Sequence, residues 1–336
     1  MRCPTAQSGA EQDTAEDTPS RERLLSVLRG EGVERPVLDP MVAEWIRSDL
    51  EDAAAAGGRL PVETTVRVTK SRLRQVLTCE RGVVEDLTAS PGIKSPDLVR
   101  GQLLDRIFAL VVVGWAPGVD PVRDALGAAG VSGDTALSDA WQALTASEKE
   151  EVREEVVAGA TSMAARWPVL PANASARLQE LLVVELAGGR IVLSGRVDLA
   201  VGRPTPGRSG TTLVDVKSGR RRHDDVLDAD WYAVLESVRH RAPPFQAGNY
   251  YLRDGSLVLH TYDEARLERS CARVADGVAR LARMAAGAVP VTSPGPSCAW
   301  CPGLKGCSPG RQHLSERDGI ESPRMTDPED EEGTPQ

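Results

Sequence analysis

The chain has 336 residues, of which 41% are hydrophobic, and its formal net charge is −9 at pH 7. This size and hydrophobic content suffice for one large domain or two ordinary ones with a real core. The acidic charge argues against a broadly basic nucleic-acid-binding surface, although five acidic residues and no basic one lie in segment 326–336. The longest apolar run, Ile107 to Val113, is far shorter than the roughly 20 residues that cross a bilayer. We therefore expect no membrane-spanning segment.

Both ends of the chain differ in composition from the rest. Residues 1–19 and 311–336 are polar, acidic or Pro-rich, and we predict that they are disordered tails because they cannot bury apolar surface. The first residues also lack the apolar segment of a secretory signal, which favours a cytoplasmic location. In that reducing compartment the six cysteines are more naturally metal ligands or buried thiols than disulfides.

The first half of the chain has mainly helical periodicity. Apolar residues at spacings of three and four predict helices over 40–56, 69–86, 95–115 and 147–167. Ser147 and Glu150 stand at the spacing of a capping box for the last of these helices. We expect N-terminal helices over 20–66 and a larger domain over 67–310.

The second half begins with short strands. Val- and Leu-rich segments 177–185, 190–201 and 211–216 are separated by turn signals and predict three strands in a meander. Helices over 231–238 and 243–253, a strand over 256–262 and a long helix over 263–286 follow. The predicted fold class is therefore α/β, with a small mixed central sheet flanked by helices.

Three charged residues interrupt these apolar strands. Asp198 lies near the end of one predicted strand, and Asp215 and Lys217 stand two apart on the next, so that their side chains leave the same face. Burying unpaired charges costs several kcal/mol, and a Mg²⁺ or Mn²⁺ ion bound by the carboxylates would offset that cost. Such an ion activates water for phosphodiester hydrolysis, and the lysine can stabilise the developing charge. The alternative is an ordinary salt bridge at a hairpin edge.

Two groups of basic residues are locally dense, and each is either a binding surface or a solvated face. The first group is Arg67, Lys70, Arg72 and Arg74, and the second is Arg220, Arg221 and Arg222.

Cysteines gather near the C-terminus. Cys298, Cys301 and Cys307 form a Cys-x2-Cys-x5-Cys pattern, and thiolates this close together indicate a metal site. A closed site needs a fourth ligand, for which the chain offers Cys3, Cys79 and Cys271. Cys3 lies in the predicted tail, and Cys271 falls on the apolar stripe of a helix, which favours a buried thiol. Cys79 remains, and soft thiolates suit either an iron–sulfur cluster or Zn²⁺.

The segments GRVDL, LVDVKSG and QAGNY resemble motifs of the PD-(D/E)XK nucleases, in particular the RecB-like, AddB-like and CRISPR-associated exonuclease subgroup. The resemblance implies a restriction-endonuclease-like fold in which Asp198, Asp215 and the Val216 carbonyl bind Mg²⁺ or Mn²⁺ and Lys217 is catalytic. It also implies that Gln246 and Tyr250 form a Gln-x3-Tyr element on a helix that contacts DNA and braces the site.

One position departs from the pattern of this subgroup. Its members carry a histidine ligand on an upstream helix, and the matching segment RGQLLDRIF has Asp105 at that position. An aspartate oxygen is also a good ligand for Mg²⁺ or Mn²⁺. Asp105 is therefore a predicted metal ligand, and a surface position for it would weaken the site.

The cysteines extend the resemblance. Ser71, Leu73 and Cys79 match a helix of the subgroup whose cysteine joins three C-terminal ones. This implies that Cys79, Cys298, Cys301 and Cys307 hold a [4Fe-4S] cluster, with Zn²⁺ as the alternative. Because such a cluster closes a very long loop, we expect it to act as a structural staple rather than as a redox sensor.

Together these patterns predict a metal-dependent DNA nuclease, an exonuclease of single- or double-stranded DNA in repair, recombination or defence. The alternatives are a catalytically impaired DNA-binding or assembly module and a zinc-stapled protein unrelated to DNA. The sequence contains no Gly-x4-Gly-Lys-Ser/Thr loop, so any helicase activity would come from a separate partner.

Overall fold

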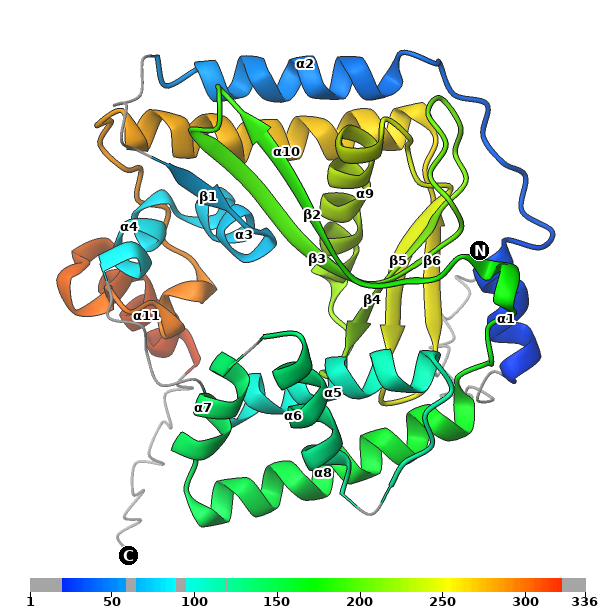
Figure 1. Cartoon of the computed structure of the whole chain (residues 1–336). Helices are drawn as coiled ribbons and strands as arrows, with labels where there is room; N and C mark the ends of the chain where they lie inside the picture. The colour runs from blue at the N-terminus through cyan, green and yellow to red at the C-terminus, as the bar shows by residue number, and fades with distance from the viewer. Residues whose placement is uncertain (1–19, 59–64, 89–94, 119, 134, 322–336) are drawn as a thin grey trace, which may run out of the picture.

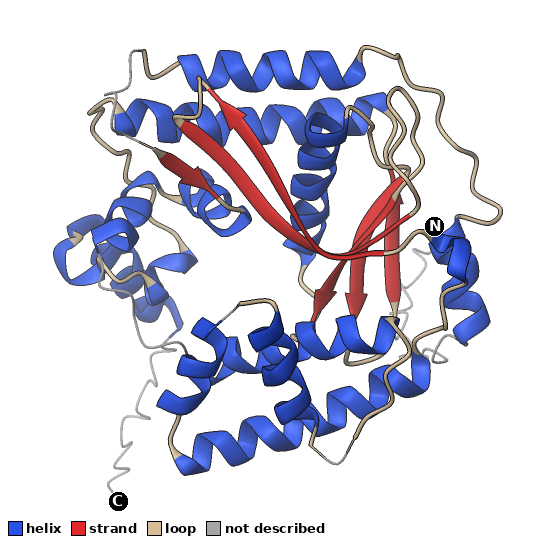
Figure 2. Cartoon of the chain, viewed as in Figure 1, coloured by secondary structure: helices blue, strands red, loops and turns tan. Residues whose placement is uncertain are grey.

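The computed structural model describes residues 20–58, 65–88, 95–118, 120–133 and 135–321. They form a mixed six-stranded sheet between two layers of helices, which confirms the predicted fold class (Figure 1, Figure 2). The strands are β1 (Val66–Val68), β2 (Arg177–Leu186), β3 (Ile191–Val201), β4 (Thr212–Lys217), β5 (Gln246–Tyr251) and β6 (Leu257–Thr261).

The sheet has the order β1-β3-β4-β5-β6, and β2 pairs with β3 off this path. Strands β2, β3 and β4 are antiparallel neighbours, as the predicted meander requires. Strand β4 then pairs in parallel with β5 through a crossover that contains helix α9 (Val226–His240).

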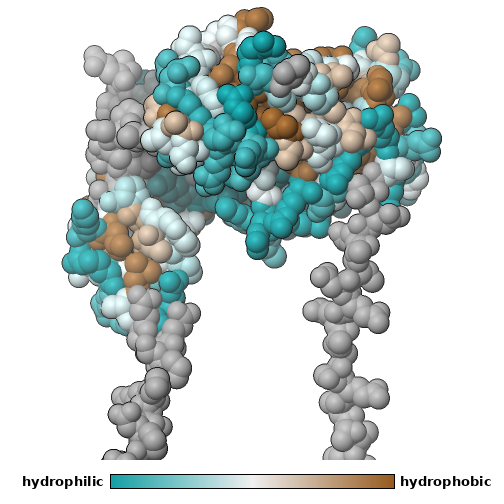
Figure 3. All heavy atoms as spheres, turned by 90° about the horizontal axis from the view of Figure 1, so that it is seen from below, coloured by the Kyte–Doolittle hydropathy of each residue, from teal (hydrophilic) through white to brown (hydrophobic). Residues whose placement is uncertain are grey.

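Two hydrophobic clusters lie on the two sides of the sheet. The first joins the sheet to α9 and to the long helices α2 (Val42–Ala55) and α10 (Glu264–Ala285). The second joins β4 and β5 to the other helical layer, formed by α1 (Arg21–Arg29), α5 (Pro96–Val112), α6 (Pro121–Val131), α7 (Thr135–Ala143) and α8 (Ala146–Arg166). Figure 3 views the molecule from the side of that second layer, where hydrophilic side chains form a broad band.

Strand β3 pairs with two different strands along one of its edges, and we call the place where these two strands diverge the fork. Its first residues, Ile191 to Leu193, pair with β1, and its last residues, Leu199 to Val201, pair with β4. The residues between these two ladders therefore face no strand on that edge. This gap opens beside the helix that follows β1, α3 (Lys70–Thr78).

The helix predicted over 243–253 is wrong. Residues Gln246–Tyr251 form strand β5, and all six are buried. A strand that is covered on both faces has no alternation of polar and apolar residues, so periodicity cannot distinguish it from a buried helix.

Other predicted boundaries also change. The helix predicted over 69–86 is broken at Cys79, whose φ of −160° and ψ of 114° are extended, between α3 and α4 (Glu80–Thr88). The capping box of α8 uses Thr145 and Glu148 instead of the predicted Ser147 and Glu150. The predicted C-terminal tail begins as helix α11 (Ser308–Glu321), whereas the predictions for 1–19 and 322–336 lie outside the described residues.

The remaining predicted helices agree closely with α2, α5, α8 and α10, and α9 is longer at both ends than the predicted 231–238. Among the described residues, no helix is both long and apolar enough to span a membrane.

Candidate active site

Asp198 lies where β3 separates from β4. The ladder between these strands ends at the pair Leu199 and Val214, so the backbone N–H of Val216 has no partner on β3. Asp198 supplies one, because its Oδ2 accepts that N–H at 2.8 Å while its Oδ1 accepts Nε2 of Gln179 at 2.9 Å. The carboxylate therefore joins three strands at the fork.

Asp215 is held between two lysines. Nζ of Lys70 lies 2.8 Å from its Oδ1, and Nζ of Lys217 lies 2.7 Å from its Oδ2. The aspartate is 3% exposed, so these pairs are largely shielded from water. Lys217 also contacts Asp228 on α9, as the even spacing of Asp215 and Lys217 on one face of β4 permits.

Asp105 reaches the same place from helix α5. A Cβ atom on Gly101, one turn earlier, would lie 3.5 Å from Oγ of Ser218, which shows how closely α5 approaches the end of β4. Asp105, Asp198, Asp215 and Val216 line one cavity of about 390 Å³. The predicted ligand residues thus meet at one cavity, and Asp105 is not a surface residue remote from it.

The carboxylates influence one another strongly. Burial and the neighbouring Asp215 raise the pKa of Asp198 to about 6, and burial together with both of these aspartates raises the pKa of Asp105 well above its usual value. Burial also opposes ionisation of Asp215, but Lys70 and Lys217 outweigh it and lower the pKa of that carboxyl. The positive charges of two lysines therefore favour ionisation of Asp215 most, and the other two carboxyl groups are harder to ionise.

The donor set fits a hard divalent cation. Three carboxyl groups face one cavity, and burial together with their mutual repulsion holds two of the three pKa values high. A cation among these oxygens would offset the repulsion, and Mg²⁺ and Mn²⁺ prefer such ligands. Asp105, Asp198 and Asp215 would hold it, and a contribution from the Val216 carbonyl stays a prediction.

Four residues of the site were missed by the sequence analysis: Lys70, Gln179, Asp228 and Tyr232. Lys70 stood only in a basic cluster. Gln179 has a φ of 50°, in the left-handed region, and no sequence pattern marked it. Asp228 and Tyr232 are four apart on α9, and the hydroxyl of Tyr232 donates to the carbonyl of Arg196 at 2.8 Å. Their spacing on the helix after β4 was the available signal.

Gln246 and Tyr250 occupy different positions from those predicted. Both lie on β5, and they are 5% and 1% exposed. The ring of Tyr250 packs against Phe108 and Trp167, with centroid distances of 5.8 and 4.8 Å. For Tyr250 this packing favours a role in the core over the predicted contact with DNA, and the helix after β4 that faces the site is α9.

A second acidic group lies near the other end of α9. Among the described residues, Glu180, Glu236 and His240 are the one group whose ligand atoms all lie within 4.8 Å of one another, and the site carboxylates are spaced more widely. The guanidinium of Arg177 already lies 2.8 Å from Glu180 and 3.0 Å from Glu236. A buried ion-pair network accounts for this group without a metal.

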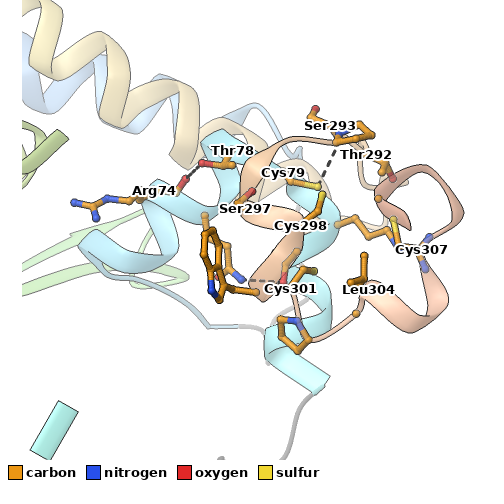
Figure 4. Close-up of a pocket in the computed structure, with 18 of the residues that line it drawn as sticks. Arg74, Thr78, Cys79, Thr292, Ser293, Ser297, Cys298, Cys301, Leu304 and Cys307 are labelled. Atoms are coloured by element: carbon orange, nitrogen blue, oxygen red, sulfur yellow. Dashed lines mark hydrogen bonds between the residues drawn. The ribbon is translucent and has the colours of Figure 1, made fainter. Parts of the chain in front are cut away.

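The four predicted cluster cysteines line a second cavity of about 340 Å³, which adjoins the first because Lys70 and Ser71 line both. Figure 4 shows Cys79, at the end of α3, facing the segment that carries Cys298, Cys301 and Cys307. Backbone N–H groups of Ser293 and Gly295 donate to the sulfurs of Cys79 and Cys298 at 3.5 and 3.4 Å.

Cys271 is fully buried on α10, as predicted, and burial raises the pKa of its thiol to about 12. Cys3 lies outside the described residues.

Asp198→Asn is expected to stabilise the metal-free protein by about 1–2 kcal/mol at pH 8. The pKa of Asp198 is higher in the folded chain than its usual 3.8, so ionisation opposes folding and the cost develops between about pH 4 and 6. An asparagine can still accept the Val216 N–H if the amide of Gln179 turns round.

Thermal unfolding at pH 8 measures this effect. Added Mg²⁺ should raise the Tm of the wild type and leave that of the variant unchanged. A metal-free variant that is less stable than the wild type would contradict the argument.

No curated protein is significantly similar in sequence to the chain. A solved structure titled "Crystal structure of SSO0001" superposes with 13% identity and a TM-score of 0.32, covering 80% of this chain and 97% of that chain. The sequence model of the PD-(D/E)XK nuclease superfamily matches residues 67–308, which contain the site carboxylates, Lys217 and the four clustered cysteines. The chain therefore belongs to the PD-(D/E)XK nuclease superfamily.

Proposed function

We propose that the protein is a divalent-metal-dependent deoxyribonuclease that hydrolyses phosphodiester bonds at the fork between β3 and β4. The observation that carries this proposal is the meeting of Asp198, Asp215 and Lys217 in a buried acidic site, with Asp105 on the same cavity. Membership of a nuclease superfamily supports it independently.

The oxygen ligands and the lysine of the site have different proposed roles. Asp105, Asp198, Asp215 and the Val216 carbonyl would hold Mg²⁺ or Mn²⁺, which lowers the pKa of a bound water and neutralises charge on the phosphate. Lys217 keeps its proton, because Asp215 and Asp228 raise its pKa in spite of burial. Its ammonium can therefore orient the attacking water and stabilise negative charge that develops on the phosphate.

Four cysteines line one cavity of about 340 Å³, and four soft thiolates suit a [4Fe-4S] cluster, with Zn²⁺ as the alternative. We include this cluster, and with it the RecB-like and AddB-like subgroup, in the proposal.

The finer parts of the proposal concern the biological role. An exonuclease that acts in repair, recombination or defence, in the cytoplasm and beside a separate helicase or repair protein, agrees with the motifs in GRVDL and LVDVKSG. The second candidate is a DNA-binding module that does not cut. It is favoured by Asp105 in place of a histidine, and by the lysine pairs that already occupy Asp215.

A cleavage assay across metals tests the main proposal. We expect the wild type to degrade end-labelled single- or double-stranded DNA with Mg²⁺ or Mn²⁺ and not with EDTA. Asp215→Asn should reduce the rate by at least about a hundredfold, because it removes one charged ligand and the partner of two lysines. Asp139→Asn, an exposed change on α7, should cut normally. DNA binding without cutting under every metal would establish the second candidate instead.

A further inference from the structure

The face of the sheet that carries Asp215 and Lys217 continues onto the next strand. In the parallel register, Asp215 pairs with Asn249 and Lys217 pairs with Tyr251, so the side chains of each pair project from the same face. Adjacent strands are about 4.8 Å apart. Asn249 and Tyr251 therefore stand one strand away from the predicted metal ligand and the catalytic lysine.

A cavity of about 440 Å³ lies over these two residues. Its other lining residues come from β6 and from the segment that joins β4 to α9: Arg221, Arg222, His223, Val226, Val258 and His260. The cavity is distinct from the one that Asp105, Asp198 and Asp215 line, because the two have no lining residue in common. None of the predicted metal ligands lines it, and neither does Lys217.

One wall of the cavity is an aromatic ring held in place. The hydroxyl of Tyr251 donates to Oδ2 of Asp225 at 3.1 Å, which fixes the orientation of the ring. The guanidinium of Arg221 lies 5.1 Å from the ring centroid, and Arg221 is exposed. A planar ligand could therefore stack on Tyr251 if the exposed Arg221 side chain moves aside or covers the ligand.

A second wall has an unsatisfied hydrogen-bond acceptor. Asn249 is 2% exposed, and its Nδ2 donates to the carbonyl of Asp225 at 3.2 Å. Its Oδ1 is buried and has no hydrogen-bond partner. Leaving such an acceptor unpaired is unfavourable, so a ligand that donates an N–H group to it would remove that cost.

The rim of the cavity is positive. Arg220, Arg221 and Arg222 are consecutive in the chain, and all three are exposed. Of the nearby acids, Asp224 pairs with Arg74 at 3.4 Å, and the carboxylate of Asp225 accepts hydrogen bonds from the backbone N–H of Arg222 and the hydroxyl of Tyr251, two residues of the cavity itself. The arginines are therefore available to bind phosphate groups.

We propose that this cavity binds one base of a single-stranded DNA segment next to the phosphodiester that is cut. The base stacks on Tyr251, an N–H of the base donates to Asn249, and Arg220 to Arg222 hold the adjoining phosphates. This inference rests on the proposed nuclease function, because it takes the site at Asp215 as the position of the cut. A single strand is required because a duplex keeps the faces of its bases stacked on one another.

An abasic scan tests the cavity without changing the fold. Labelled strands of about twelve nucleotides, each lacking one base at a different position, are titrated with the full chain in EDTA so that nothing is cut. We expect loss of the base at one position to weaken binding by about tenfold, since stacking on an aromatic side chain contributes strongly to single-strand affinity. Intact duplex of the same length should bind more weakly than the single strand.

Protein variants test whether the base that matters for affinity binds in this cavity. Arg221→Gln should weaken binding and reduce the dependence on that base, whereas Arg239→Gln, an exposed change near the other end of α9, should behave as the wild type. Tyr251→Phe keeps the ring and should retain the abasic dependence. Equal affinity for all abasic strands, or an Arg221→Gln variant with unchanged dependence, would overturn the proposal, as would failure to bind any single strand.

The outcomes also separate the two proposals. If the protein cuts DNA but binds all the abasic strands equally, the base-binding proposal is wrong and the nuclease proposal stands. If loss of one base weakens binding but the protein never cuts, the base-binding cavity stands and the nuclease proposal is wrong.

Discussion

Lys217→Ala is expected to reduce metal-dependent DNA cleavage by about a hundred- to a thousandfold, the effect of losing one well-placed stabilising group in comparable sites. Nζ of Lys217 lies 2.7 Å from Oδ2 of Asp215 and also contacts Asp228, so the variant removes a charge that neighbouring groups hold in one position. Initial rates on labelled DNA at saturating Mg²⁺ measure the loss. Binding of uncut DNA in EDTA should change much less.

Two further variants test whether the exact position of the positive charge at residue 217 matters as well as its presence. Lys217→Arg keeps the charge but places a larger planar group in a site that is only 16% exposed, and we expect it to restore little activity. Lys149→Ala, on α8 and outside the cavity, should cut at the wild-type rate. A Lys217→Ala variant with full activity would show that this lysine is not catalytic.

Cys79→Ser is expected to lower the Tm of the protein by about 10 °C and to abolish iron binding. Cys79 follows α3, whereas the other three cysteines lie more than 200 residues later in the chain. A cluster held by all four would close that long loop, and removing such a link costs several kcal/mol. For a domain of this size, each kcal/mol corresponds to roughly 2–4 °C.

Anaerobic purification with iron and sulfide analysis checks this prediction. The wild type should contain about four iron and four sulfide atoms per chain, as the cluster formula requires. Cys271→Ala is the matched control, because Cys271 is buried on α10 and outside the cysteine cavity, and it should leave the iron content unchanged. One zinc per chain and no iron would establish the zinc alternative.

Local patterns in the sequence were sufficient to predict much of the secondary structure of this protein and which face some residues occupy. The period of two along β4 puts Asp215 and Lys217 on one face, and the turn signals at 188–189 and 203–210 separate β2, β3 and β4 correctly. The period of α10 predicts the burial of Cys271. These properties depend on neighbours in the chain, so composition and spacing report them directly.

Other properties depend on contacts between distant segments. Gln246–Tyr251 could be recognised as a strand only after β4 and β6 were in place on either side, because both of its faces are buried. The break at Cys79 is equally invisible in the apolar spacing of 69–86, because that spacing continues across it.

The sequence by itself determined which local elements carry the groups of the candidate site: two aspartates and a lysine on adjoining strands and an aspartate on an upstream helix. Only the tertiary structure decided their surroundings. The fork in β3 leaves the Val216 N–H for Asp198, and it opens a gap in which Lys70, 145 residues before Asp215, can reach that carboxylate. Charges separated so far in sequence interact only when folding brings them within a few ångströms in a medium that screens them poorly. For that reason no local pattern could identify Lys70.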